Sequence, residues 1–203
     1  MPEITSIKPQ KSKKRVNIHL DGKFSFGLDL ENWMKLGLKV GDKLSEEEIE
    51  EIVKKAEFQK TFDKILRFAM LRPRSKKEIN DWLKRKKVYE SMHGGLFNRL
   101  KRMNLINDEE FSRWWIKQRT EFRPKGKRAL FSELMGKGVD RRIIEQVISE
   151  ADLNEDKLAK EVLNKKAYKW EKLKGFDRKK KMSDFLARRG FSWEIIKRVI
   201  NKN

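Results

Sequence analysis

The sequence predicts a mainly α-helical protein, with a small N-terminal α+β unit that contains a β-hairpin and three tandem three-helix modules in an elongated, curved array. Apolar residues alternate near the N-terminus, as in half-buried strands, and follow helical spacing from Glu57 onward. The helical pattern also recurs about every 50 residues, which is typical of repeats that bury their apolar faces on one another. We expect the α+β unit over residues 1–57 and the modules over 58–106, 107–153 and 154–203.

Strand signals dominate the start of the chain. Residues 15–20 and 24–28 alternate polar and apolar side chains, and Asp21-Gly22 between them supplies the positive φ angles of a tight turn. Ile4 to Lys8 is a candidate third strand. Asp29 to Leu36 is expected to form a short helix closed by Gly37, and Ser45-Glu46-Glu47-Glu48 is a capping box that opens the next helix.

The repeat is found by sliding the sequence on itself. An offset of 51 places Arg72-Pro73-Arg74 on Arg123-Pro124-Lys125. An offset of 52 superposes six apolar or glycine positions of the second and third copies: Leu134, Gly138, Ile143, Ile144, Val147 and Ile148 fall on Leu186, Gly190, Ile195, Ile196, Val199 and Ile200. Each copy divides into three expected helices: 58–70, 75–86 and 89–103; 108–121, 126–136 and 140–150; 155–173, 177–188 and 192–201.

Charge is distributed unevenly along the chain. The protein has 51 Lys plus Arg and 31 Asp plus Glu, a net charge of +20, yet residues 1–58 hold 11 of each sign. The whole excess therefore lies beyond residue 58, where it would attract polyanions, of which nucleic acid is the commonest. A solvated or ion-paired helical surface is the competing interpretation.

Composition also limits the classes of site. No cysteine is present, no run of 18 apolar residues occurs, and the N-terminus lacks the layout of a signal peptide, so we expect a cytoplasmic protein without a membrane segment. His19 and His93 have no partner in sequence, and no phosphate-binding glycine loop is present. The cluster Asp108-Glu109-Glu110 is better explained by a helix start than by a Mg²⁺ site. We expect no catalytic residue, no metal and no cofactor.

Aromatic and basic residues are the remaining candidates for contact with a nucleic acid. Most tryptophans are expected in cores, with one of Trp82, Trp114, Trp115, Trp170 and Trp193 left as a plausible exposed contact. Basic clusters recur at the junction between the first and second helices of each module. The candidate residues are Arg72, Arg74, Lys76, Lys77, Lys84, Arg85, Arg123, Lys125, Lys127, Arg128, Arg178, Lys179, Lys180 and Lys181. Such residues would hold a phosphate backbone without reading its sequence.

The pattern resembles the RecX family, regulators of the bacterial recombinase RecA. The resemblance lies in Arg72-Pro73-Arg74-Ser75-Lys76-Lys77-Glu78-Ile79 with Leu83, in Leu105-Ile106-Asn107-Asp108-Glu109-Glu110-Phe111, and in Leu134, Gly138-Val139, Ile143 and Ile144. It covers about residues 58–201, with the third module as the loosest match and the N-terminal unit outside the shared region. Gly126 satisfies a glycine of the family pattern.

The resemblance implies a non-enzymatic regulator that docks into the groove of the RecA filament on DNA. We expect a monomer whose partners are the RecA filament and single- or double-stranded DNA. It also implies down-regulation of the ATPase, strand-exchange and co-protease activities of RecA. The alternative from composition alone is a general architectural protein that binds bare DNA or RNA, and a metal-dependent nuclease is a third, weaker hypothesis.

Overall fold

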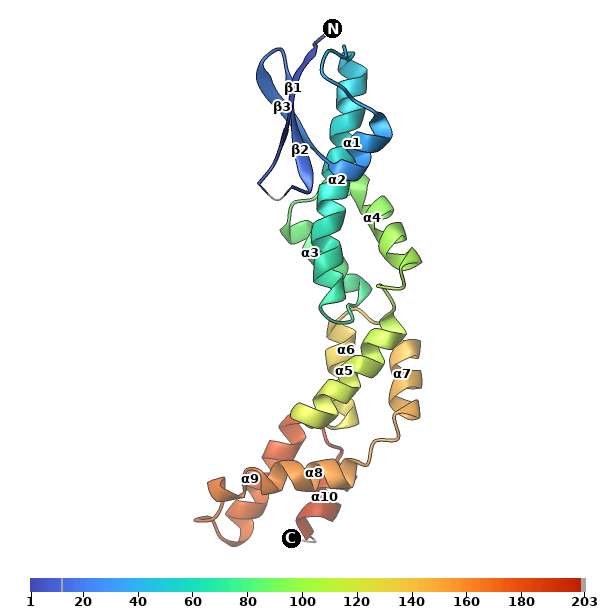
Figure 1. The fold of residues 1–203 in the computed structure, drawn as a ribbon. Helices are drawn as coiled ribbons and strands as arrows, with labels where there is room; N and C mark the ends of the chain where they lie inside the picture. Colours follow the sequence, from blue (N-terminus) through green and yellow to red (C-terminus); the bar gives the residue numbers. More distant parts are fainter. Residues whose placement is uncertain (12, 202–203) are drawn as a thin grey trace. The chain divides into compact units, whose positions relative to one another are not determined.

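The computed structural model describes residues 1–11 and 13–201, which divide into two compact units. Unit 1 combines Met1–Met70 with Lys86–Arg99, and unit 2 combines Leu71–Arg85 with the described part of Leu100–Asn203. Within the described residues there are ten α-helices, one short 3₁₀-helix and three strands, so the mainly α prediction with a small N-terminal sheet is confirmed (Figure 1).

The N-terminal sheet is antiparallel with strand order β1-β2-β3. Its strands are β1 (Ile4–Pro9), β2 (Arg15–Leu20) and β3 (Lys23–Asp29). Asp21 and Gly22 have φ angles of 46° and 78°, as a tight hairpin between β2 and β3 requires. The predicted hairpin and the candidate third strand are both confirmed.

Two helices follow the sheet in unit 1. Helix α1 (Leu30–Leu36) is capped by the Asp29 carboxylate and ends at Gly37, whose φ is 64°. Ser45 and Glu48 form the reciprocal bonds of a capping box before α2 (Glu46–Met70). We predicted separate helices on the two sides of residue 57, and this was wrong, because α2 runs through that position without a break.

The α2 residues on one face complete the core of the sheet. This core contains Ile4, Val16, Ile18, Leu20, Phe26, Leu28, Leu38, Leu44, Ile52 and Ala56. The sheet therefore buries its apolar face against the first half of α2.

The remaining helices fall in the predicted triplets. They are α3 (Lys76–Arg85), α4 (Glu90–Arg102), α5 (Asp108–Phe122), α6 (Lys127–Gly136), α7 (Arg141–Glu150), α8 (Glu155–Asn164), α9 (Gly175–Arg188) and α10 (Trp193–Asn201). The exception is the helix predicted over 155–173. It ends at Asn164, and a turn with the short 3₁₀-helix η1 (Ala167–Lys169) brings Trp170 back into the core against Phe185.

The cores of the second and third modules use the residues that established the repeat. Phe111, Leu130, Leu134, Val139, Ile144, Val147 and Ile148 are buried between α5, α6 and α7. Leu158, Leu186, Phe191, Ile195, Ile196, Val199 and Ile200 are buried between α8, α9 and α10. The shared apolar stripe of α7 and of α10 thus faces the two other helices of its module.

Within unit 2, a first junction joins the start of α3 to the following module. The Ser75 hydroxyl donates to the Lys137 carbonyl at 2.8 Å, and the Lys76 amide donates to the Asp108 carboxylate at 2.9 Å. Asp108 is a buried residue at the start of α5. Because its carboxylate accepts from the Lys76 amide, it also caps the start of α3.

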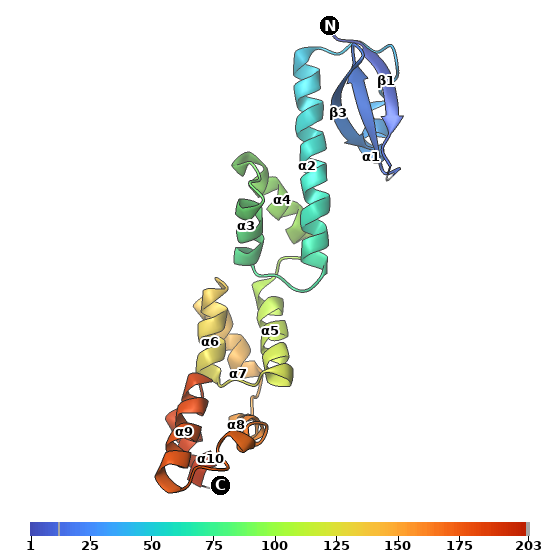
Figure 2. The same ribbon diagram turned by 90° about the vertical axis from the view of Figure 1, so that its left-hand side faces the viewer.

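A second junction repeats this arrangement one module later. The Gly126 amide donates to the Arg189 carbonyl at 2.9 Å, and the Lys127 amide donates to the Glu155 carboxylate at 2.9 Å. A side chain at Gly126 would overlap the Gly190 carbonyl, which explains the glycine at this position. In Figure 2, α3, α6 and α9 follow one another along one side of this unit.

Candidate nucleic-acid interface

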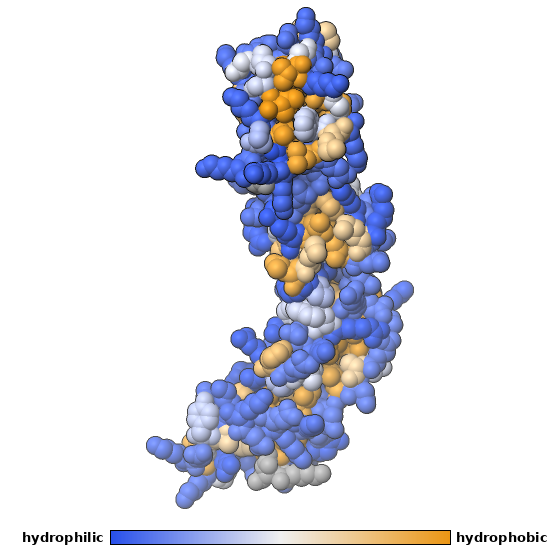
Figure 3. Space-filling model, viewed as in Figure 1, coloured by the Kyte–Doolittle hydropathy of each residue, from blue (hydrophilic) through white to orange (hydrophobic). Residues whose placement is uncertain are grey.

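Most of the predicted basic residues are exposed, and nine of them form no ion pair among the described residues. We call these nine the free cations: Lys84, Arg85, Arg123, Lys127, Arg128, Arg178, Lys179, Lys180 and Lys181. All nine lie in unit 2. The visible face of this unit in Figure 3 is largely hydrophilic, as expected for a surface of charged side chains.

Two of the strongest sequence candidates have a structural role around Glu78. The Glu78 carboxylate accepts two hydrogen bonds from the Arg72 guanidinium, at 2.9 and 3.0 Å, and one from Lys137 at 2.8 Å. Arg74 lies 3.8 Å from the same carboxylate, and its side chain is only 10% exposed. The Arg72 guanidinium also covers the Trp114 ring at 5.1 Å.

The electrostatics of this Glu78 centre favour its charged form. Burial alone would raise the pKa of Glu78, but hydrogen bonds from Arg72 and Lys137 outweigh burial and lower the pKa. Burial, reinforced by the positive charge of Arg72, lowers the pKa of Arg74, which nevertheless stays charged at neutral pH.

A second acid, Glu133, organises the next module in the same way. It accepts hydrogen bonds from the Trp115 indole and the Arg119 guanidinium, both at 2.8 Å, and from the Lys125 ammonium. Burial opposes these bonds, but together they lower the pKa of Glu133. Lys137 lies 5.0 Å above the Trp115 ring while it binds Glu78, so one side chain links this Glu133 centre to the Glu78 centre.

The predicted interface is therefore divided by how its charges are paired. Arg72, Arg74 and Lys125 are partly or fully buried in ion pairs within unit 2. Lys76 and Lys77 occupy an intermediate position, because they are exposed but lie near Asp108 and Asp81.

The third basic cluster differs in local structure from the first two. Arg178, Lys179, Lys180 and Lys181 lie inside α9, which begins at Gly175, whereas the earlier clusters span a loop and the first turn of a helix. The helix predicted over 177–188 already placed this cluster in a first helical turn, and α9 begins two residues earlier, at Gly175. The cluster therefore lies on an exposed helical surface.

The tryptophans separate clearly by exposure. Trp82 and Trp170 are buried, Trp114 and Trp115 are partly covered by cations, and Trp193 is 64% exposed. Of the five tryptophans considered from the sequence, Trp193 is therefore the exposed one.

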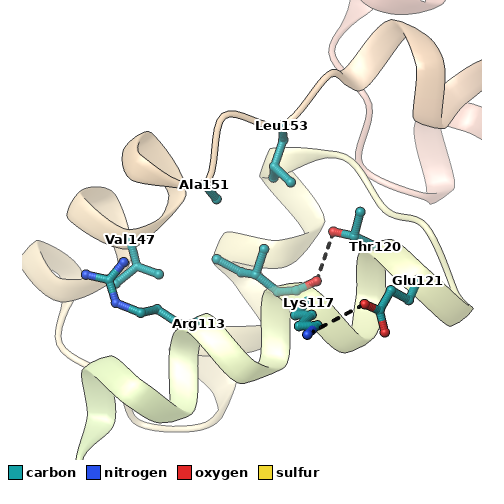
Figure 4. Close-up of a pocket in the computed structure, with 8 residues that line it drawn as sticks. Arg113, Lys117, Thr120, Glu121, Val147, Ala151 and Leu153 are labelled. Carbon is teal, nitrogen blue, oxygen red and sulfur yellow. Dashed lines mark hydrogen bonds and ion pairs between the residues drawn. The ribbon is translucent and has the colours of Figure 1, made fainter.

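A cavity in the second module is lined by charges that neutralise one another. It has a volume of about 350 Å³ and lies between α5, α7 and the segment that follows α7 (Figure 4). Arg113 at its edge pairs with both Glu109 and Glu150, and Lys117 pairs with Glu121. This cavity therefore offers little net charge to a polyanion.

The sequence did not lead us to predict the ion pairs of the Glu78 and Glu133 centres, which also include Arg119 and Lys137. The available signal was an acid on the helix that follows each basic cluster, four residues after Arg74 and eight after Lys125.

In the described part of the chain, no group of three or more His, Asp or Glu side chains is arranged to hold a metal ion. Nor does any described helix have the length and apolar character needed to span a membrane.

These features define a class of protein: a tandem array of three-helix modules with an exposed basic surface, preceded by a small sheet domain. Family models match three segments: the regulatory protein RecX N-terminal domain over residues 2–45, the second three-helix domain of RecX over 107–148, and the third over 154–200. The chain belongs to the RecX family of regulatory proteins. Our expectation that the N-terminal unit lies outside the shared region was wrong, because this unit has a family match of its own.

Relatives of known name support the same assignment. The chain is 34% identical to regulatory protein RecX of Bacillus licheniformis over 208 residues, covering 100% of this chain and 78% of that protein. It is 33% identical to regulatory protein RecX of Bacillus subtilis, with coverages of 100% and 77%, and 36% identical to that of Listeria welshimeri, with coverages of 96% and 73%.

Two solved structures share the fold. A crystal structure of regulatory protein RecX matches 99% of this chain and 100% of its own, with a TM-score of 0.74 and 23% identity. A crystal structure of RecX from Lactobacillus salivarius matches 71% of this chain and 95% of its own, with a TM-score of 0.60 and 23% identity.

Proposed function

We propose that this protein binds the RecA filament on DNA and modulates, mainly inhibits, the ATPase, strand-exchange and co-protease activities of RecA. It would act in the cytoplasm, as a monomer, in homologous recombination, DNA repair and the SOS response. The observation that carries the proposal is the set of nine free cations in unit 2 of a chain that belongs to the RecX family.

The free cations suit a phosphate backbone because none of them forms an ion pair with an acid among the described residues. An exposed Lys or Arg that replaces condensed counterions on DNA gains free energy from their release. We therefore assign DNA contact to the free cations. We add Lys76 and Lys77, because their ion pairs are more exposed than those of Arg72, Arg74 and Lys125. Arg72 and Arg74, which meet Lys137 of the next module at Glu78, would act indirectly by keeping consecutive modules in register. Lys125 would act through its pair with Glu133 inside the second module.

The protein would act by occupying the groove of the RecA filament and not by catalysing a reaction. A regulator that lies along the filament alters the equilibrium between filament states only by the difference in its affinity for them. It needs no cofactor and no metal for this action. The N-terminal unit, which is electrically balanced, would contact protein or act as a spacer.

The test is the DNA-dependent ATPase rate of RecA as this protein is titrated in, with a parallel titration onto the same DNA without RecA. We expect suppression at concentrations too low to coat bare DNA. If the rate falls only when the DNA is saturated, the alternative of a general architectural protein on bare DNA or RNA is favoured. Cleavage of the DNA in the presence of Mg²⁺ would instead indicate a nuclease.

A further inference from the structure

A cavity at the second junction combines an exposed tryptophan with two arginine side chains that form no ion pair among the described residues. It has a volume of about 540 Å³ and is lined by Arg128, Ala129, Ala187, Arg188, Gly190, Phe191, Trp193 and Ile196. This volume falls in the range of roughly 300–1,000 Å³ that is typical of small-ligand sites. We call it the Trp193 cavity.

The exposure of Trp193 is not explained by the fold. Its module buries Ile195, Ile196, Val199 and Ile200 in the core, and Trp193 lies outside this stripe. An exposed indole leaves a large apolar surface in water, and this surface is available for contact with a partner. Trp193 is also unlike Trp114 and Trp115, because no described cation lies over its ring.

The charges of the cavity are available to a ligand. Neither Arg128 nor Arg188 forms an ion pair among the described residues, and both are exposed. Glu194 is the acid whose charge interacts with Arg128, but a hydrogen bond from Ser192 also engages its carboxylate. Two cations near one acid leave the cavity with a net positive charge.

The walls suit a flat ring. Phe191 and Ile196, each 2% exposed, line the cavity together with Ala129, Ala187 and Gly190, so the lining between the two arginines and Trp193 is apolar or small. A planar ligand with an apolar face and a neighbouring negative charge would match this lining. An unpaired nucleobase with its phosphate has these properties, whereas a base inside a duplex hides its faces in the stack.

We propose that the Trp193 cavity binds an unpaired base of single-stranded DNA, with the base stacked on the Trp193 indole and the adjacent phosphates held by Arg128 and Arg188. The inference deepens the proposed function, and it rests on that proposal in assuming that the chain meets DNA. It assigns to the second junction a contact that distinguishes single strands from duplexes, which phosphate contacts alone do not provide.

The test compares strands that differ only in their bases. Fluorescence anisotropy would measure binding of the full chain to oligothymidylate, to an abasic strand of equal length and to a duplex of equal length. We expect Trp193→Ala to weaken oligothymidylate binding by about 5- to 100-fold and to change abasic-strand or duplex binding less than about twofold. Trp193→Phe should retain most of the affinity, because a phenyl ring also stacks. Arg128→Ala and Arg188→Ala should weaken oligothymidylate and abasic binding alike.

Phe176→Ala is the matched control, since Phe176 is a 78% exposed aromatic residue on α9 close in sequence to four free cations. It should change none of the three affinities by more than about twofold. Equal binding of oligothymidylate by wild type and Trp193→Ala, or an equal loss on both strands, would overturn the stacking role. Thermal unfolding of each variant separates the second outcome from misfolding.

The RecA ATPase titration distinguishes this inference from the proposed function. If wild type suppresses the ATPase and Trp193→Ala loses that suppression while binding oligothymidylate normally, Trp193 contacts protein and the base site is refuted. If wild type prefers oligothymidylate to the abasic strand through Trp193 but leaves the ATPase unchanged, the base site stands and the regulatory proposal fails.

Discussion

A substitution of Glu78 tests most sharply whether Arg72 and Arg74 stabilise the fold of unit 2. Glu78→Gln keeps the size of the side chain but removes the charge that faces Arg72, Arg74 and Lys137. Breaking one member of a buried ion pair costs about 3–5 kcal/mol. Here Arg72 and Lys137 are about one-third exposed, at 28% and 33%, and water recovers part of the loss. We expect the free energy of unfolding to fall by about 2–4 kcal/mol.

The assay is urea denaturation followed by tryptophan fluorescence, to which Trp114 contributes beside the Glu78 centre. Asp81→Asn is the control, because it removes an acid from the same helix whose pair with Lys77 is about half exposed. Its cost should stay below about 1 kcal/mol. Equal losses for the two variants would refute the structural role of the centre.

The pH dependence gives a second readout of the same prediction. The pKa of Glu78 in the folded protein lies below its ordinary value of 4.5, so its stabilisation is complete above that value and is lost as the pH falls through the folded pKa. The difference between wild type and Glu78→Gln should therefore be constant near neutral pH and shrink below about pH 4.5. A difference that persists unchanged into strong acid would contradict the assigned cause.

Further predictions concern the second junction and the free cations. Gly126→Ala should destabilise unit 2 by about 1–3 kcal/mol in urea denaturation, because the new methyl group meets the Gly190 backbone. Gly136→Ala, with open space around it, should be neutral or stabilising, and a similar loss for both would refute the close packing. For DNA, about five phosphate contacts give a slope of log affinity against log salt near −4 to −5. Glutamine at all three positions 179–181 should reduce the slope magnitude by about 2–3 without changing the melting temperature, and an unchanged slope would place the interface elsewhere.

Local chemistry made most of the fold predictable. The Asp21-Gly22 turn, the Ser45 capping box and the helix end at Gly37 each depend on a few adjacent residues, and all are confirmed. The two errors in helix length have different causes. No glycine or proline interrupts the sequence around residue 57, so α2 continues there, and this signal was available. The early end of α8 reflects tertiary packing of Trp170, which no local pattern reveals.

The candidate site was less predictable because a charged side chain looks the same in sequence whether it contacts a partner or an internal acid. Arg72 and Arg123 occupy equivalent repeat positions, yet Arg72 binds Glu78 and Arg123 is exposed without a described ion pair. The difference arises because the residue equivalent to Glu78 in the second module is Ala129, which offers no carboxylate. Only contacts between helices settle such cases.

The separation of paired and free cations also separates their responses to salt. Surface charges are screened over about 8 Å at physiological ionic strength, whereas partly buried pairs and backbone hydrogen bonds are screened much less. The two junctions depend on bonds such as Ser75 to Lys137 and Gly126 to Arg189, which involve backbone groups. Rising salt should therefore release DNA from the free cations well before it loosens unit 2, so that a salt titration measures the interface on an intact fold.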